Sequence, residues 1–185
     1  PCNQVYRMKI VLLIIIGMVL GYIVKMIVNW LKIDNYIMSR KNFFLEAVGA
    51  LMVTWSAVNL GIEEAVIFSI ITLTLAGISV IDFHTFEIPL IFIIIGVVAS
   101  IAGILLKVIF LSAAFWGIFV GALIPLAIML ILWTITKRQG MGYGDIQLGI
   151  VLGAWLGPMR MALTLFGASL LSLLAWLGVS LFKGF

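Results

Sequence analysis

The chain has 185 residues, of which 65% are hydrophobic and only 10% are charged. Soluble globular domains carry about 25% charged and about 45–50% apolar residues, so this composition excludes an ordinary soluble domain. The net charge of +4 would suggest a nucleic-acid partner in a soluble protein. Here the basic residues lie mostly between apolar segments, where we expect them to set topology and contact lipid headgroups.

Long apolar runs that do not alternate with period two favour membrane-spanning helices over barrel strands. The pattern predicts an all-α, polytopic transmembrane helix bundle with about seven segments, six to eight being compatible with it. The sixth segment is short, so it either crosses a thinned stretch of bilayer with little tilt or joins the seventh around Gly157-Pro158. The segments are Met8–Leu31, Phe43–Leu60, Glu64–Asp82, Ile88–Leu106, Ile109–Ile135, Asp145–Leu156 and Met159–Phe182.

The distribution of basic residues predicts the orientation of these segments. We treat Pro1–Arg7 as an N-terminal extension and residues 8–185 as a single membrane domain. More basic residues lie on the side that the positive-inside rule assigns to the cytoplasm, and Asp82 and Asp145 then fall at the cytoplasmic edge. The basic residues on that side are Lys32, Arg40, Lys41, Lys137, Arg138 and Lys183.

Small residues recur at helical spacing in three segments. Such rows let membrane helices approach closely, so we expect them to mark interior packing. The row in the sixth segment predicts that this segment lies inside the bundle and carries Asp145 inward. The rows are Gly17 and Gly21; Gly117 and Gly121; and Gly149, Gly153 and Gly157.

Two aspartates stand in polar breaks of the chain, Asp82 within residues 81–89 and Asp145 within residues 137–149. A carboxylate in a membrane segment is costly and usually faces a cavity or a partner. Each aspartate alone is compatible with a boundary residue, and Asp145 also with a helix N-cap or a partner of Arg138. The two together, on one side of the membrane, predict a paired-carboxylate catalytic site.

Glycine and proline flank both aspartates. Gly142 and Gly144 permit backbone angles closed to other residues and remove side-chain bulk beside Asp145, so an extended peptide would fit there. Pro89 suits the first turn of the fourth helix and would end the third helix just past Asp82. Asp82 is therefore expected near a helix C-terminus and Asp145 near a helix N-terminus.

This asymmetry predicts how a close pair would share a proton. A helix N-terminus favours an ionised carboxylate, so we expect Asp82 to hold the proton more often and Asp145 to act more often as the base. The ionised member would activate a shared water, and the neutral member would donate to the oxyanion. This chemistry needs no metal and no cofactor, which fits a chain with one cysteine, Cys2, and one histidine, His84.

Two motifs occur in order on this polytopic chain. The first is Ile81-Asp82 followed by Ile88-Pro89, and the second is Gly142-Tyr143-Gly144-Asp145. With the stretch Arg40–Glu46, they resemble the type IV prepilin peptidases, the bacterial membrane aspartic peptidases of the GxGD class. The resemblance covers roughly Met8 to Lys183 and implies that the two aspartates are the catalytic pair.

The resemblance also implies a substrate. Family members cleave type IV prepilin or pseudopilin precursors, in pilus assembly and protein secretion, after a glycine that ends a short basic leader. Cleavage occurs at the cytoplasmic face of the bacterial inner membrane. Many members also N-methylate the product, an activity associated with paired CxxC motifs between the first two helices. Here the corresponding loop, about Lys32–Asn42, has no cysteine, so the chain resembles a short form in which methylation is doubtful.

Other polar residues have weaker predictions. Glu46 is expected to pair with Lys41 or Arg40, and Lys25 to extend from the first helix toward the headgroups. Glu87, Tyr143 and His84 are candidate substrate contacts. For Glu87 a solvated loop position is the more common role, and for His84 an interfacial loop position.

Two other functions are compatible with paired membrane aspartates. A transporter or channel subunit would use them as a cation or proton relay, with ionisable residues near the midplane and often inverted repeats. No internal repeat is visible, and both aspartates lie near an edge. A non-catalytic assembly factor is the third reading, and the presence of both candidate catalytic residues argues against it.

Overall fold

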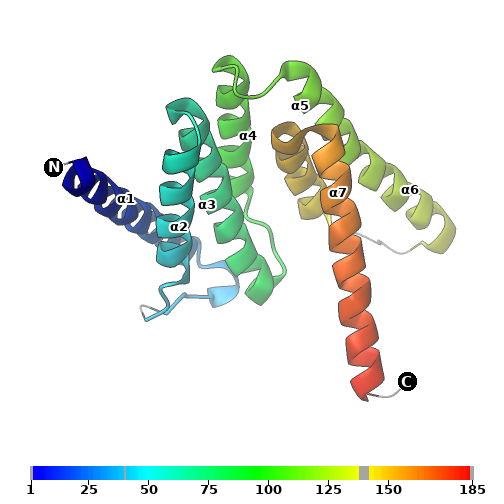
Figure 1. Cartoon of the computed structure of the whole chain (residues 1–185). Coiled ribbons are helices and arrows are strands. Elements are labelled where there is room, and N and C mark those ends of the chain that lie inside the picture. Colours follow the sequence, from blue (N-terminus) through cyan, green and yellow to red (C-terminus); the bar gives the residue numbers. More distant parts are fainter. Residues whose placement is uncertain (1, 40, 138–141, 184–185) are drawn as a thin grey trace. The chain divides into compact units, whose positions relative to one another are not determined.

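A computed structural model describes residues 2–39, 41–137 and 142–183, and this part of the chain is helical with no strand (Figure 1). The all-α prediction is confirmed. The elements are α1 (Cys2–Leu31), the short turn η1 (Ile33–Asn35), α2 (Phe44–Asn59), α3 (Ile62–Thr85), α4 (Leu90–Leu105), α5 (Leu111–Ile118), η2 (Phe119–Leu123), α6 (Ile124–Thr136) and α7 (Tyr143–Lys183).

Within the part of the chain that the structure describes, four helical runs are long and apolar enough to cross a bilayer: α1, α3, the continuous run from α5 to α6, and α7. The apolar helices α2 and α4 have 16 residues each. All seven predicted segments fall on helices, which makes the chain a polytopic membrane protein. Helix α1 begins at Cys2, ahead of the predicted start at Met8.

The helices form two compact units, one over Pro1–Val108 and one over Ile109–Phe185. We call them unit 1, with α1 to α4, and unit 2, with α5 to α7. Each unit is described by itself below. The single membrane domain over residues 8–185 stays a prediction.

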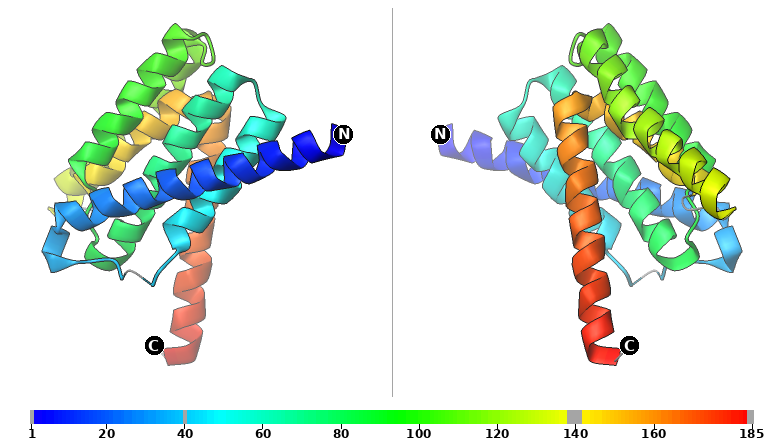
Figure 2. Two further views of the ribbon diagram at one scale, coloured as in Figure 1. Left: turned by 90° about the vertical axis from the view of Figure 1, so that its left-hand side faces the viewer. Right: turned by 90° about the vertical axis from the view of Figure 1, so that its right-hand side faces the viewer.

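In unit 1, helix α1 crosses α2 with the two backbones in contact (Figure 2). A Cβ atom added at Gly17 would lie 2.7 Å from the Cα atom of Ala50, and one added at Gly21 would lie 2.7 Å from the Cα atom of Glu46. Gly49 of α2 faces Gly17 in return. The predicted packing role of the first glycine row is confirmed.

A hydroxyl pair joins α2 to α3 inside unit 1. The Oγ atoms of Ser56 and Ser69 lie 3.0 Å apart, and both residues are buried. Each hydroxyl also lies within hydrogen-bond distance of a carbonyl of its own helix, at Val53 and Ala65. Each hydroxyl has a single hydrogen, so one donates across the pair and the other donates to the carbonyl of its own helix, which leaves neither buried group without a partner.

In unit 2, the second and third glycine rows pack against each other. A Cβ atom at Gly117 would lie 2.8 Å from the carbonyl carbon of Gly153, and one at Gly121 would lie 3.2 Å from that of Gly149. The first half of α7 therefore lies directly on α5 and η2. This confirms the packing predicted for both rows.

The wide turn η2 separates α5 from α6. The amide of Ile124 donates to the carbonyl of Phe119, five residues back instead of four. The next residue, Pro125, has no N–H to donate to the carbonyl of Gly121. The missing donor explains why the helix widens by one residue at this point.

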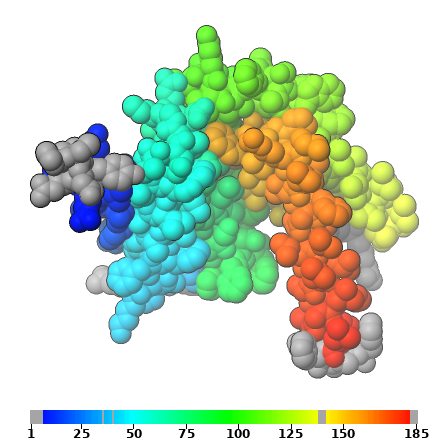
Figure 3. All heavy atoms as spheres, viewed as in Figure 1, coloured from blue at the N-terminus to red at the C-terminus, as the bar shows by residue number. Residues whose placement is uncertain are grey.

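Helix α7 is broken at Gly157, whose φ of 72° and ψ of 176° lie in a region that only glycine adopts readily. Pro158 follows, and the sixth and seventh predicted segments join at a sharp bend there, which is one of the alternatives that the sequence left open (Figures 1 and 2). Beyond it the second half of α7 extends past the rest of unit 2, with most of its side chains exposed (Figure 3).

Candidate active site

Asp82 lies in the last turn of α3 with its side chain exposed. The helix continues to Thr85 and ends because Phe86 adopts a left-handed conformation, with a φ of 56°. The Phe86 amide donates to the Asp82 carbonyl at 2.9 Å. Pro89 was predicted to end α3 and to lie in the first turn of α4, but it precedes α4 as the extended residue at its N-terminal boundary.

His84 belongs to the same turn of α3, so its prediction as a loop residue was wrong. Its Nδ1 atom lies 2.8 Å from the Val80 carbonyl oxygen, which only accepts, so Nδ1 carries the hydrogen. Its ring stacks on Tyr36 with centroids 4.2 Å apart and planes 27° apart. Burial raises the pKa of the Tyr36 phenol. This aromatic contact joins the α1–α2 loop, residues 32–42, to the end of α3.

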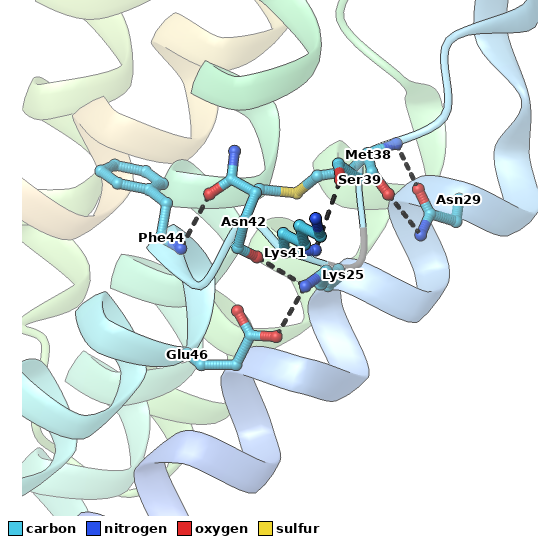
Figure 4. Close-up of polar contacts among 8 residues, drawn as sticks. All are labelled: Lys25, Asn29, Met38, Ser39, Lys41, Asn42, Phe44 and Glu46. Atoms are coloured by element: carbon cyan, nitrogen blue, oxygen red, sulfur yellow. Dashed lines mark hydrogen bonds and ion pairs between the residues drawn. The ribbon is translucent and has the colours of Figure 1, made fainter.

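The α1–α2 loop is bound to α1 by side chains (Figure 4). The Oδ1 atom of Asn29 accepts the Met38 amide at 2.7 Å, and its Nδ2 atom donates to the Met38 carbonyl at 3.4 Å. The Lys25 ammonium donates to the Asn42 carbonyl at 2.5 Å. It also forms an ion pair with Glu46 at 2.9 Å. We call these four contacts the loop clamp.

The loop clamp corrects two predictions. Lys25 does not extend to the headgroups, because it is 4% exposed and paired with Glu46, which is 8% exposed. Glu46 therefore pairs with a lysine of α1 and not with Lys41, and Arg40 lies outside the described residues. The sequence spacing indicates that Lys25 faces α2, because Lys25 follows Gly17 and Gly21 at intervals of four and so lies on the same face of α1.

Asp145 lies in the first turn of α7, beside the positive end of the helix dipole. Because α7 begins at Tyr143, Asp145 is inside the helix and is not its N-cap. The next residue, Ile146, is buried against Ala122 and Met129. Asp145 itself is exposed within unit 2, and its inward direction in the whole bundle stays a prediction.

Gly142 leaves room for the Asp145 carboxylate. A Cβ atom at Gly142 would lie 3.3 Å from Oδ2 of Asp145, closer than such atoms ordinarily approach. Gly144 is helical, and among the described glycines only Gly157 has a positive φ. The prediction of reduced bulk therefore holds for Gly142, while Gly144 does not use a backbone angle closed to other residues.

Two candidate substrate contacts lie beside the aspartates. Tyr143 is 66% exposed and borders a hollow of about 180 Å³ with Met129 and Trp133 of α6. Glu87 lies exposed in the α3–α4 loop, as predicted. Contact of these residues, or of His84, with substrate stays a prediction. The partner proposed for Asp145, Arg138, lies outside the described residues.

Asp82 in unit 1 and Asp145 in unit 2 each lie exposed at the end of an apolar helix, as Glu63 and Glu64 do at the start of α3. The approach of Asp82 and Asp145 to one another stays a prediction. The described helices define a class, the polytopic membrane proteins.

The chain belongs to the type IV leader peptidase family, whose model matches residues 67–177, more than half of the sequence. The matched region contains Asp82 and the Gly142–Asp145 motif and leaves out the loop clamp. A prepilin leader peptidase/N-methyltransferase of Dichelobacter nodosus is 31% identical over 90 residues. That alignment covers 49% of this chain and 30% of the relative, so the chain spans less than a third of its length. No solved structure matches the chain.

Proposed function

We propose that the chain is a membrane aspartic endopeptidase that removes the basic leader of type IV prepilin-like precursors, cutting after a glycine. The family match carries this proposal, because it includes both aspartate motifs in order. The relative's name, prepilin leader peptidase/N-methyltransferase, supports the substrate class. N-methylation is not part of the proposal.

Asp82 and Asp145 perform the proposed reaction as a pair. One carboxylate takes a proton from a water molecule held between them, and this water attacks the scissile carbonyl carbon. The other carboxyl donates its proton to the developing oxyanion. When the C–N bond breaks, the nitrogen takes the proton that the first carboxylate removed from water and leaves as an amine, and a hydroxyl proton of the intermediate returns to the second carboxylate as the new carboxyl group forms. Exposure of both side chains leaves each accessible to peptide and water.

The proposed site lies at the cytoplasmic face of the bacterial inner membrane. Basic residues around the α1–α2 loop and after α6 support this orientation. Gly142 supports substrate access, because a glycine beside Asp145 leaves room for an extended peptide chain.

A cleavage assay in liposomes tests the proposal. The substrate is a peptide with a basic leader, a glycine and a hydrophobic helix, and the variants are Asp82→Asn and Asp145→Asn. Each should lower kcat by about 10²–10⁴-fold, the usual contribution of a general acid or base. Glu64→Gln, an exposed change in the first turn of α3 at the end away from Asp82, is the matched control and should cleave normally.

Three outcomes would contradict the proposal: no cleavage by the wild type on several such peptides, normal cleavage by either aspartate variant, or loss of cleavage in Glu64→Gln as well. Proton flux in the same liposomes then tests the relay alternative. A flux that both aspartate variants abolish, without cleavage by the wild type, would favour a transporter.

A further inference from the structure

The α1–α2 loop is held in one conformation by side chains of α1. Its regular structure is limited to the three residues of η1. Asn29 binds both backbone groups of Met38, and Lys25 binds the backbone carbonyl of Asn42, so two points of the loop are attached to one helix (Figure 4). A loop bound at two points loses most of its conformational freedom.

The ion pair in the loop clamp is not explained by stability alone. Lys25 and Glu46 are both at least nine-tenths buried, and Glu46 Oε2 has no hydrogen-bond partner among the described residues. Replacing such a pair with apolar residues often leaves a protein equally stable or more stable. What an apolar pair could not replace is the bond from Lys25 to the Asn42 carbonyl.

Just ahead of its two attachment points, at Tyr36, the loop contacts the end of α3 that carries Asp82. Tyr36 stacks on His84, and His84 in turn bonds to the Val80 carbonyl of the same turn. Thr85 donates to the Ile81 carbonyl at 3.0 Å. The turn that places the Asp82 backbone is thus restrained by its own side chains and by the loop.

We propose that Lys25, Glu46 and Asn29 are positioning residues for Asp82, acting through the α1–α2 loop and the stack of Tyr36 on His84. This inference rests on the proposed function. The loop clamp fixes the loop on α1, the loop fixes the last turn of α3, and that turn sets where the Asp82 carboxylate meets water and substrate. None of the three positioning residues touches the reacting atoms.

Removing one attachment tests the first link. Asn29→Ala deletes both bonds to Met38 and leaves the ion pair intact, and kcat should fall about tenfold with KM little changed, since misplacement acts on the chemical step. Tyr36→Ala should cause a similar loss, and Tyr36→Phe, which retains the ring, should restore kcat. Ser100→Ala is the control, because this buried hydroxyl bonds only within α4.

A double-mutant cycle tests whether these residues act in one chain of contacts. If they do, Asn29→Ala and Tyr36→Ala combined should lower kcat no further than the stronger single change. Losses that multiply would show independent effects and overturn the proposal. Failure of Tyr36→Phe to restore kcat would overturn the role assigned to the stack.

The double change Lys25→Met with Glu46→Leu separates positioning from stability. Its Tm should equal or exceed that of the wild type, because no buried charge remains. Its kcat should stay about tenfold low, because the Asn42 carbonyl has lost its donor. Recovery of both Tm and kcat would show that the pair only stabilises the fold.

Hydrogen exchange of the loop amides, measured without substrate, tests the clamp apart from catalysis. The Met38 amide donates to Asn29 and should be protected in the wild type and exchange at least tenfold faster in Asn29→Ala. Equal exchange rates would overturn the clamp. A clamp confirmed in a protein that cleaves no prepilin-like peptide would refute the proposed function and leave the loop restraint established.

Discussion

The two units hold their aspartates in different ways. In unit 1, Asp82 ends a helix whose last turn is restrained by polar and aromatic contacts from a loop far away in sequence. In unit 2, Asp145 begins a helix that is set in place by backbone contact between glycines. The position of Asp82 depends on side-chain contacts between segments that are distant in sequence. The position of Asp145 depends on glycines, which have no side chain and let the backbones touch. Changes that add bulk should therefore harm unit 2 most, and changes that remove polar groups should act in unit 1.

The largest effect should come from filling the glycine contact of unit 2. Gly153→Val places side-chain atoms against the backbone of Gly117, which cannot move aside, and should destabilise unit 2 by about 3 kcal/mol. Gly167→Val, in the same helix with nothing within 4 Å of its Cβ position, should change stability by less than about 0.5 kcal/mol. Thermal unfolding in detergent measures both. Equal losses would mean that close packing does not hold α7.

The bend of α7 offers a second, smaller change in unit 2. At Gly157 a Cβ atom has room, its nearest neighbour being the Ala113 Cβ at 3.6 Å, so Gly157→Ala isolates backbone strain. The expected loss of unfolding free energy is about 1–3 kcal/mol. Gly178→Ala, at a helical position with open surroundings, is the control. An unchanged Tm for Gly157→Ala would show that the bend does not require glycine.

Gly142→Ala should affect cleavage and not folding. The new methyl group would press on the Asp145 carboxylate and lower kcat about tenfold, equivalent to about 1.4 kcal/mol, with little change in Tm. The same substitution at Gly61, where nothing lies within 4 Å, should leave both quantities unchanged. Normal cleavage by Gly142→Ala would mean that the carboxylate moves aside without cost.

The smallest effect belongs to the hydroxyl pair of unit 1. Ser69→Ala removes the bond to Ser56 and should cost about 0.6 kcal/mol, the average for hydrogen bonds between membrane helices. A double-mutant cycle with Ser56→Ala measures the coupling directly. A coupling energy near zero would mean that unit 1 is stabilised by its glycine contacts and ion pair and not by this hydroxyl pair. The two units would then be more alike than their structures indicate.

Local signals predicted most of unit 2. Helix ends, the glycine rows and the break at Gly157 all depend on residues within one or two turns, so periodicity and backbone preference were enough. Asp145 lies four residues before Gly149 and so shares the stripe of Gly149 and Gly153, yet within unit 2 it is exposed while Ile146 is buried. The glycine row predicts which face of α7 packs, but not how far toward the start of the helix the packing extends.

The site in unit 1 was harder to predict because its partners are distant. Lys25 and Glu46 are separated by 21 positions, and no local pattern pairs a lysine inside an apolar helix with a glutamate of the next. Tyr36 and His84 belong to different helical hairpins, so only the folded unit brings them together. Both aspartates stand out in the sequence, because polar breaks in an apolar chain are conspicuous, and their catalytic role stays a prediction. The contacts that restrain Asp82 do not stand out in this way.

The wide turn η2 has a consequence for the register of unit 2. One helical residue corresponds to about 100° of rotation, so the extra residue turns all of α6 by that angle relative to α5. The rotation lets Gly117 of α5 and Met129 of α6 face the same half of α7. Deleting one residue from Phe119–Leu123 would turn Met129 and Trp133 away from the helix that carries Asp145. Insertions or deletions in η2 would therefore rotate the α6 side chains that lie beside the start of the helix carrying Asp145.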